Sequence, residues 1–266
     1  MSVIENKKIY IFSKQSANVL FKFMGNMDFL KNIIRKKAFI PRYNEENLEY
    51  LNIYGVDKIV FPMVCFCDIN LSRLDSHVKY YGPYGIALKK KWGIEKGIQP
   101  IHYINENSYI RKDLSYLFSK SYNALSQNEE VSEYNDYLLT HLLFIKPLVG
   151  KMLKNEEYDE KNFTDEKEWR YVPEILEEDN INLIIPSVYI DRENAYDYYS
   201  NKLNNIEHLW LHFDYEDIEY IMVSSEKDRE EFISFIEEEI DNEEDKMKKY
   251  ILISKIIVYD IINKDW

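Results

Sequence analysis

The residues best suited to chemistry lie in one short segment, Asp165–Tyr171. Side chains alternate along a strand, so a strand here places Glu166, Glu168 and Arg170 on one face and the aromatic residues on the other. Two carboxylates on one face repel each other unless both are solvated, a cation lies between them, or a functional site requires them. An exposed strand with a local salt bridge and a catalytic carboxylate pair are therefore both open interpretations.

A second candidate segment, Tyr80–Leu88, is rich in tyrosine and glycine. Its two glycines allow a close approach of the backbone to a ligand or to another strand, and a plain turn before a strand explains the same pattern. His208 and His212 are four residues apart, but their neighbours are typical of a strand, so we predict no metal site. The sequence contains no dinucleotide-binding, phosphate-loop, nucleophile-elbow or zinc-protease motif.

Hydrophobic periodicity predicts the elements that position these residues. We expect strands at Lys8–Phe12, Ile59–Phe66, Tyr84–Leu88, Glu166–Val172, Ile218–Val223 and Tyr250–Ile262, and helices at Met27–Lys37, Leu114–Leu125, Val131–Ile145 and from Ser225 to Ile240. Asn26 can cap the first helix, and Ser225 with Asp228 resembles a capping box for the last. Interleaved elements at irregular spacing favour an α+β fold with a mixed, mostly antiparallel sheet and flanking helices. No linker or repeat divides the chain, so we expect one domain over residues 1–266.

The formal net charge of −13 argues against broad nucleic-acid binding and against docking on anionic lipid. The short basic runs Arg35–Lys37 and Lys89–Lys91 are expected to be solvated surface. Cys65 and Cys67 alternate onto one face of a strand and are expected to be small core residues. The longest apolar run, Ile59–Cys67, is too short to span a bilayer, and the start of the chain lacks a signal-peptide pattern. We therefore expect a cytoplasmic protein without a membrane partner.

Several segments resemble the AbiGi family of abortive phage-infection proteins in order and spacing. They are Arg42-Tyr43, Pro62–Ile69, Tyr81–Ile86, Trp92–Ile94 with Pro100, Glu166–Pro173, Ser254–Ile257 and Asp265-Trp266. The similarity extends from about residue 8 to the C-terminus. It implies an antitoxin or regulator of a nucleotidyltransferase-like toxin, in a system that stops the growth of infected cells before phage spreads. A cognate toxin or another phage-defence protein is then the expected partner, and no cofactor is needed.

The layout is also similar to ADP-ribosyltransferase-like folds, which implies an alternative function as an NAD-dependent transferase. By that resemblance Glu168 is the catalytic carboxylate, holding the nicotinamide ribose, and Glu166 orients or deprotonates the acceptor. The resemblance places Tyr84 in the nicotinamide pocket, and Arg42 and Ser13 at the remaining cofactor-binding positions. The sequence departs from the transferase pattern in its first strand, where an isoleucine stands in place of the ribose-binding histidine.

Three hypotheses follow. The first is a non-enzymatic antitoxin, the second is an NAD-dependent ADP-ribosyltransferase-like effector, and the third is a nucleotide- or phage-sensing module without turnover. Fold-level similarity alone does not decide between them.

Overall fold

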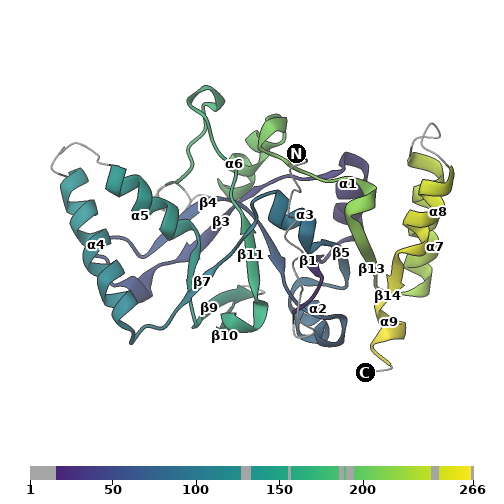
Figure 1. Ribbon diagram of the computed structural model, residues 1–266, viewed down its shortest axis with the longest axis horizontal. Coiled ribbons are helices and arrows are strands. Elements are labelled where there is room, and N and C mark those ends of the chain that lie inside the picture. Colours follow the sequence, from purple (N-terminus) through teal and green to yellow (C-terminus); the bar gives the residue numbers. More distant parts are fainter. Residues whose placement is uncertain are drawn as a thin grey trace, which may run out of the picture.

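The longest strand, β4 (Lys58–Cys67), is buried on both sides and lies in the middle of the sheet. Its side chains alternate, so that Val64 and Phe66 face one apolar cluster while Phe61 and Met63 face another. A strand with two buried faces needs a layer of structure on each side. The computed structural model shows this arrangement, with helices on both faces of a central sheet (Figure 1). It describes residues 16–126, 133–154, 157–185, 189, 195–240 and 246–264.

The main sheet joins strands that are distant in the sequence. The other strands of this sheet are β1 (Val19–Met24), β3 (Arg42–Asn47), β5 (Tyr84–Lys89), β6 (Gln99–Pro100), β11 (Glu168–Tyr171), β13 (Ile218–Val223) and β14 (Ile256–Val258). Their order is β14-β13-β5-β1-β4-β11-β6, and β3 pairs with β4 beside this path. Within these strands every pair is antiparallel except β13 with β14. The prediction of an α+β fold with a mixed, mostly antiparallel sheet is confirmed.

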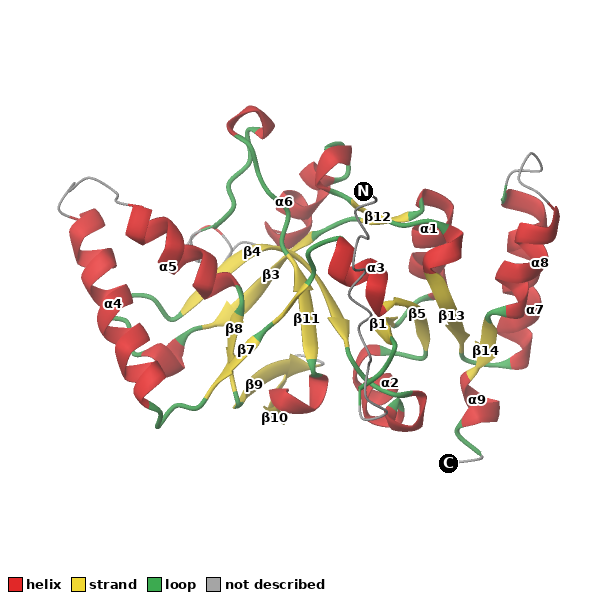
Figure 2. Cartoon of the chain, in the orientation of Figure 1, coloured by secondary structure: helices red, strands yellow, loops and turns green. Residues whose placement is uncertain are grey.

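Smaller pairings and helices surround this sheet (Figure 2). The remaining strands are β2 (Ala38–Phe39), β7 (His102–Ile104), β8 (Ile145–Pro147), β9 (Val149–Lys154), β10 (Glu157–Asn162) and β12 (Leu211–His212). The α-helices are α1 (Met27–Lys36), α2 (Asp75–Tyr81), α3 (Lys90–Glu95), α4 (Tyr109–Ser126), α5 (Glu133–Leu143), α6 (Ala195–Leu203), α7 (Glu226–Glu239), α8 (Lys246–Ser254) and α9 (Tyr259–Ile262). Short 3-10 turns include η1 (Glu49–Leu51), η2 (Leu71–Arg73), η3 (Phe163–Glu166), η4 (Glu177–Asp179), η6 (Glu207–Leu209) and η7 (Tyr215–Asp217).

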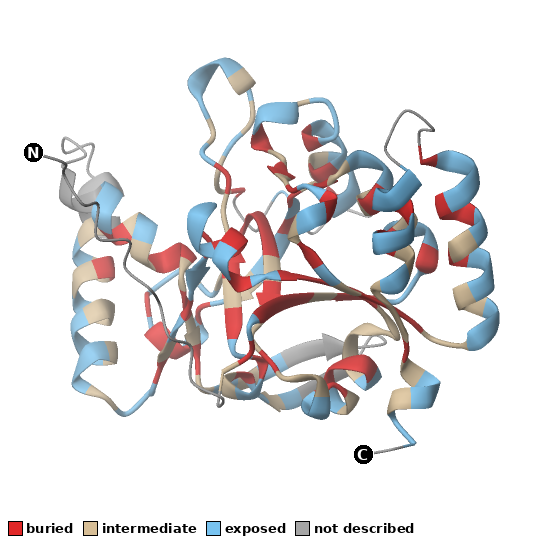
Figure 3. Cartoon of the chain, turned by 45° about the vertical axis from the view of Figure 1, so that its right-hand side comes forward, coloured by how far each residue is buried: buried red, intermediate tan, exposed pale blue. Residues whose placement is uncertain are grey.

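Each face of the sheet is covered by its own helices. Helices α1, α3, α7 and α8 bury apolar side chains in the cluster that contains Val64 and Phe66. On the opposite face α4 and α5 pack with Phe61 and Met63, whereas α2 packs in a separate cluster around Phe21. Buried residues accordingly follow the strands, and the outward sides of the helices are exposed (Figure 3).

The two apolar clusters under α2 and under α4–α5 meet at the end of β4. Cys65 packs against the α4–α5 cluster and Cys67 against the α2 cluster, so both cysteines lie on one face as predicted. The residues paired with them are Arg170 and Glu168 of β11. The charged residues of β11 therefore lie at the boundary between two apolar regions.

Local capping signals locate two helices correctly. Helix α1 begins at Met27, where the Asn26 side chain accepts a hydrogen bond from the backbone of Asp28 at 2.7 Å. Helix α7 begins after Ser225, which forms a reciprocal capping box with Asp228. Both starts are confirmed because a cap needs only residues that are neighbours in the chain. The predicted strand at Lys8–Phe12 lies outside the described residues.

Two other predictions are corrected. The segment Tyr250–Ile262 is not one strand, because α8 continues to Ser254 and only the three residues of β14 pair with β13. Burial of Lys249 and Leu252 follows a helical spacing that its apolar composition obscured. The basic run Lys89–Lys91 is not wholly solvated either. Lys90 is buried, because its ammonium group lies 2.6 Å from the Asp68 carboxylate beneath it.

Candidate functional site

Strand β11 directs its charged side chains into the protein interior. Glu168 and Arg170 share one face, and Trp169 and Tyr171 share the other, as the alternation predicted. Glu168 is 4% exposed and Arg170 is 0% exposed. The interpretation of this segment as an exposed strand is therefore wrong, but the local salt bridge is present, with 2.7 Å between Arg170 and Glu168. The strand also lies inside the sheet, because β4 and β6 pair along its two edges.

Glu166 reaches the same place by a different route. It ends the 3-10 turn η3, and Lys167 then adopts a left-handed conformation with φ of 43°, so the strand begins only at Glu168. The prediction of a strand from Glu166 is thus corrected at its first two residues. The Glu166 carboxylate is nevertheless 3.3 Å from the Lys146 ammonium group, which also lies 3.0 Å from Glu168. The structure therefore brings the two predicted carboxylates onto one cation.

Six charged residues, three of them buried and three partly buried, form a single connected group, which we call the ionic cluster. Its members are Glu46 of β3, Lys146 of β8, Lys161 of β10, Glu166 of η3, and Glu168 and Arg170 of β11. Three carboxylates face three cations, so the cluster is formally neutral. Charges removed from water are tolerated when they are paired and hydrogen-bonded in this way.

Each nitrogen of the Arg170 guanidinium group donates a hydrogen bond. It donates from Nε to Glu168 at 2.8 Å, from Nη2 to Glu46 at 2.6 Å, and from Nη1 to the backbone carbonyl of Leu143 at 2.7 Å. The group also lies over the ring of Phe61, 5.5 Å from its centre. An arginine held by three different elements fixes the distance between β3, β11 and the end of α5.

The other end of the cluster is built around Glu166. Lys161 donates to one oxygen of this carboxylate at 2.5 Å, and the hydroxyl of Tyr81 donates to the same oxygen. Lys161 also donates to the Tyr81 hydroxyl at 2.8 Å. This end therefore ties α2, β10 and η3 together.

The pKa shifts in the cluster follow from burial and pairing. Burial alone would raise the pKa of the Glu168 carboxyl, but Lys146 and Arg170 outweigh it and hold that pKa well below its usual range. Burial likewise opposes the charged form of Lys146, yet Glu168, Glu46 and Glu166 raise its pKa well above the usual value. Lys146 and Lys161 likewise outweigh burial at Glu166 and hold the pKa of its carboxyl below the usual value. All three groups therefore stay ionised at neutral pH.

The remaining predicted cofactor-binding residues do not join this cluster. Tyr84 packs on the opposite face of the sheet, and its hydroxyl lies 3.4 Å from Asp228 at the start of α7. Arg42 is exposed and pairs with Asp197 of α6 at 2.7 Å. Ser13 lies outside the described residues.

The two carboxylates of the predicted catalytic pair already have partners within the chain. A catalytic carboxylate of the transferase type needs an oxygen that can receive a sugar hydroxyl. Both carboxylates on this face already receive ammonium, guanidinium or hydroxyl donors from within the chain. The aromatic residue expected to line the pocket is on the other side of the sheet. The catalytic roles of Glu166 and Glu168 stay predictions.

Comparison with known proteins identifies the family. Residues 27–224, more than half of the chain, match the family described as "Putative abortive phage resistance protein AbiGi, antitoxin". The chain belongs to this family. The abortive phage resistance protein AbiGi of Lactococcus lactis subsp. cremoris is 38% identical to it over 249 residues, which is 86% of this chain and the whole of that protein. The resemblance inferred from the sequence is confirmed.

No solved structure matches this AbiGi-family chain, so an ADP-ribosyltransferase-like fold stays a prediction. Every residue of the ionic cluster falls within the part that matches the AbiGi family. Across the described residues, none of the helices combines the length and the apolar character that crossing a membrane requires. The described residues likewise contain no group of three or more His, Cys, Asp or Glu side chains that could hold a metal ion.

Sequence reasoning about this AbiGi-family protein missed half of the cluster. Glu46, Lys146 and Lys161 were not singled out, because each is one charged residue among many in a chain with 30% charged residues. Lys146 carried a weak signal, since it stands alone between the apolar Ile145 and Pro147. Tyr81 was within the family-like segment, but its partner Glu166 is 85 residues away.

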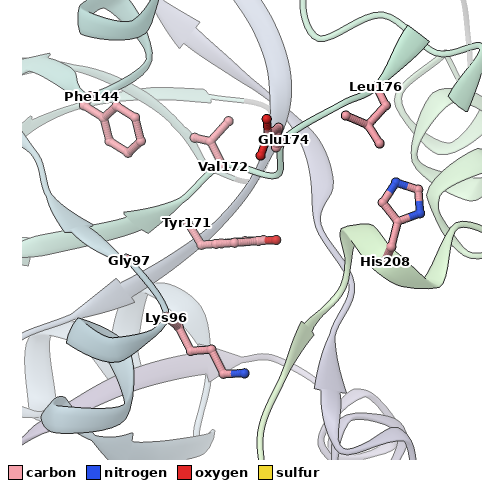
Figure 4. A pocket seen from close by; sticks show the side chains of 8 residues that line it. All are labelled: Lys96, Gly97, Phe144, Tyr171, Val172, Glu174, Leu176 and His208. Carbon is pink, nitrogen blue, oxygen red and sulfur yellow. The ribbon is translucent and has the colours of Figure 1, made fainter. Parts of the chain in front are cut away.

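A hollow of the AbiGi-family fold lies at the end of β11, around Tyr171 and Val172 (Figure 4). This open pocket has a volume of about 400 Å³ and is lined by Lys96, Gly97, Phe144, Tyr171, Val172, Glu174, Leu176 and His208. The Tyr171 hydroxyl donates to the backbone carbonyl of Leu209, and burial raises the pKa of that hydroxyl. His208 pairs with Asp179, outside the pocket lining. Among the described residues, no hydrogen bond joins two titratable side chains of this lining, so it lacks a nucleophile–base pair.

Proposed function

We propose that this chain is a non-catalytic antitoxin or regulator of a nucleotidyltransferase-like toxin in an abortive phage-infection system. The family to which it belongs is described as an antitoxin, and its relative from Lactococcus lactis is named an abortive phage resistance protein. The partner is then the cognate toxin or another protein of the same defence system.

The observation that carries the proposal is the neutral ionic cluster. The sequence offered one acidic pair for catalysis, Glu166 and Glu168. Both carboxylates form ion pairs within the chain, with Lys146, Lys161 and Arg170. Such a cluster fixes how β3, β8, β10 and β11 sit against one another, because each cation must meet its own carboxylate. We infer that the carboxylates hold a binding scaffold in shape rather than perform turnover.

The charge of the chain supports a protein partner. A net charge of −13 disfavours broad contact with phosphate backbones and is complementary to a basic protein surface. A partner that binds nucleotides or nucleic acid itself presents such a surface. Antitoxin action through direct contact is therefore consistent with the electrostatics.

The test is rescue of growth. The gene neighbouring this one is expressed from an inducible promoter, with and without the full chain, and growth is followed after induction. We expect the chain to be harmless alone and to restore growth in the presence of the toxin. The double variant Lys146→Met with Glu168→Gln, which keeps the cluster neutral, should also rescue if its circular dichroism and melting temperature show it folded. A soluble, folded wild-type chain that fails to restore growth would falsify the antitoxin assignment.

The alternative is an ADP-ribosyltransferase-like effector with Glu168 as its catalytic carboxylate. One observation favours it, namely that Glu166 and Glu168 converge on a single cation in the fold. The same growth assay separates the two functions. Growth arrest by the wild type alone, lost in the folded double variant and accompanied by transfer of labelled ADP-ribose from NAD, would assign the transferase function.

A further inference from the structure

A small pocket opens beside the ionic cluster, between α2 and the β10–η3 segment. Its volume is about 200 Å³, and its lining consists of Ser76, His77, Tyr80, Tyr81, Glu160, Lys161, Asn162, Asp165 and Glu166. Helix α2 and the β9–β10 hairpin lie on the same side of the sheet in Figure 1. Pockets for whole nucleotides and drug-sized ligands usually measure about 300–1,000 Å³, so this one suits a single side chain or a small molecule.

The pocket carries an excess of negative charge. Lys161 is its one cation, and that ammonium group is already paired with Glu166 at 2.5 Å. Glu160 and Asp165 have no ion pair or hydrogen bond of their side chains within the described residues. Glu166 is also paired with Lys146 at 3.3 Å, so the two negative charges left without an ion pair within the described residues are those of Glu160 and Asp165, which are both exposed. A bound cation would compensate them.

A buried imidazole provides the second, independent observation. His77 lines the pocket from α2, is 6% exposed, and has no hydrogen-bond partner for Nε2 among the described residues. Its ring packs near Phe23, with 5.8 Å between the ring centres. Burial lowers the pKa of His77, Lys161 adds to this effect, and Glu166 and Asp165 oppose it. A buried polar atom without a partner is uncommon in folded proteins and marks a place where a ligand or water completes the bonding.

We propose that this pocket binds a guanidinium or primary ammonium head group. Asp165 and Glu160 supply the charge-assisted acceptors, and the imidazole of His77 supplies a further polar contact in the buried part of the site. The head group can be the arginine or lysine side chain of a partner protein, or a free alkylamine. The inference does not depend on the antitoxin assignment, because the pocket exists in the isolated chain and its test uses a small molecule.

Calorimetric titration of the full chain with agmatine tests the proposal. Butylurea, a neutral urea analogue that keeps an alkyl chain but has neither a guanidinium nor an ammonium group, is the matched ligand control. We expect agmatine to bind the wild type and the urea analogue to bind at least about tenfold more weakly, the factor expected when one charged hydrogen bond is lost. Asp165→Asn and Glu160→Gln should each weaken agmatine binding by about tenfold. Glu178→Gln, which removes an exposed carboxylate outside the lining, should leave it unchanged.

The fold and the source of the ligand are controlled separately. His77→Phe keeps a ring of similar size, so we expect weaker binding with an unchanged circular dichroism spectrum. Binding of agmatine together with acetyl-arginine N-methylamide points to a partner's side chain, whereas binding of agmatine alone points to a free amine. Equal affinity for agmatine and its urea analogue, or unchanged binding by Asp165→Asn, overturns the proposal. Absence of agmatine binding to the folded wild type overturns it as well.

Discussion

Replacing Glu168 with glutamine removes one negative charge from the ionic cluster while preserving its shape. The carboxylate lies 2.7 Å from Nη2 of Arg170 and 3.0 Å from Nζ of Lys146. At an effective dielectric constant of about 20, each pair represents roughly 5–6 kcal/mol of attraction. The desolvation of a buried carboxylate, several kcal/mol, offsets a large part of this sum. Removing the charge of one partner in a buried ion pair therefore destabilises the fold by about 3–5 kcal/mol.

The remaining partners limit the damage. Arg170 keeps Glu46 at 2.6 Å, and Lys146 keeps Glu166 at 3.3 Å, so we expect the lower end of that range for Glu168→Gln. The matched variant Lys146→Met removes the opposite charge. The double variant restores neutrality, and its destabilisation should be about 2 kcal/mol smaller than the sum of the two single effects.

Urea unfolding followed by tryptophan fluorescence and circular dichroism measures these differences at pH 7. The exposed substitution Glu178→Gln is the control and should change the free energy of unfolding by less than about 0.5 kcal/mol. A loss below about 1 kcal/mol for Glu168→Gln, or strict additivity in the double variant, would refute the reasoning that these charges hold the scaffold together.

Three further predictions follow from the same structure. Folding lowers the pKa of Glu168, so the unfolded chain binds more protons at acid pH. The free energy of unfolding should therefore fall as the pH drops below about 4.5, and it should fall less steeply with pH in Glu168→Gln. An equal pH dependence in both proteins would contradict this. Gly82→Ala should destabilise the fold by about 2 kcal/mol or more in urea titrations, because φ is +107° and the added Cβ would lie 2.4 Å from the backbone of Gly25. Gly97→Ala should cost only about 1 kcal/mol, because its φ is +71° but the added Cβ would meet open space. Burial raises the pKa of Cys65 to about 12 and raises that of Cys67 as well. Although both side chains are partly exposed, their thiols should therefore react with a chromogenic disulfide much more slowly in the folded chain than after unfolding, and equal rates in the two states would contradict this.

Short-range patterns determined much of the secondary structure. Strand β4 follows from a continuous apolar run and β13 from an apolar segment interrupted only by Glu219, and α1 and α7 begin at caps formed by Asn26 and Ser225. These signals involve residues within a few positions of one another, so the sequence alone contains them. The prediction of one strand over Tyr250–Ile262 was wrong, because a short apolar run is compatible with a helix as well as with a strand.

Only the tertiary structure decided what the acidic segment does. The sequence predicted the alternation of side chains along β11. The cations paired with Glu168 and Glu166 belong to Lys146 and Lys161, on strands that no local pattern relates to β11. Whether two neighbouring carboxylates are solvated, catalytic or structural depends on what lies within about 4 Å of their oxygens. That neighbourhood is created by long-range packing. The sequence by itself thus established the family, the α+β class and the face shared by Glu168 and Arg170. The burial and neutrality of the cluster arise when Glu46, 122 positions earlier than Glu168, folds against it.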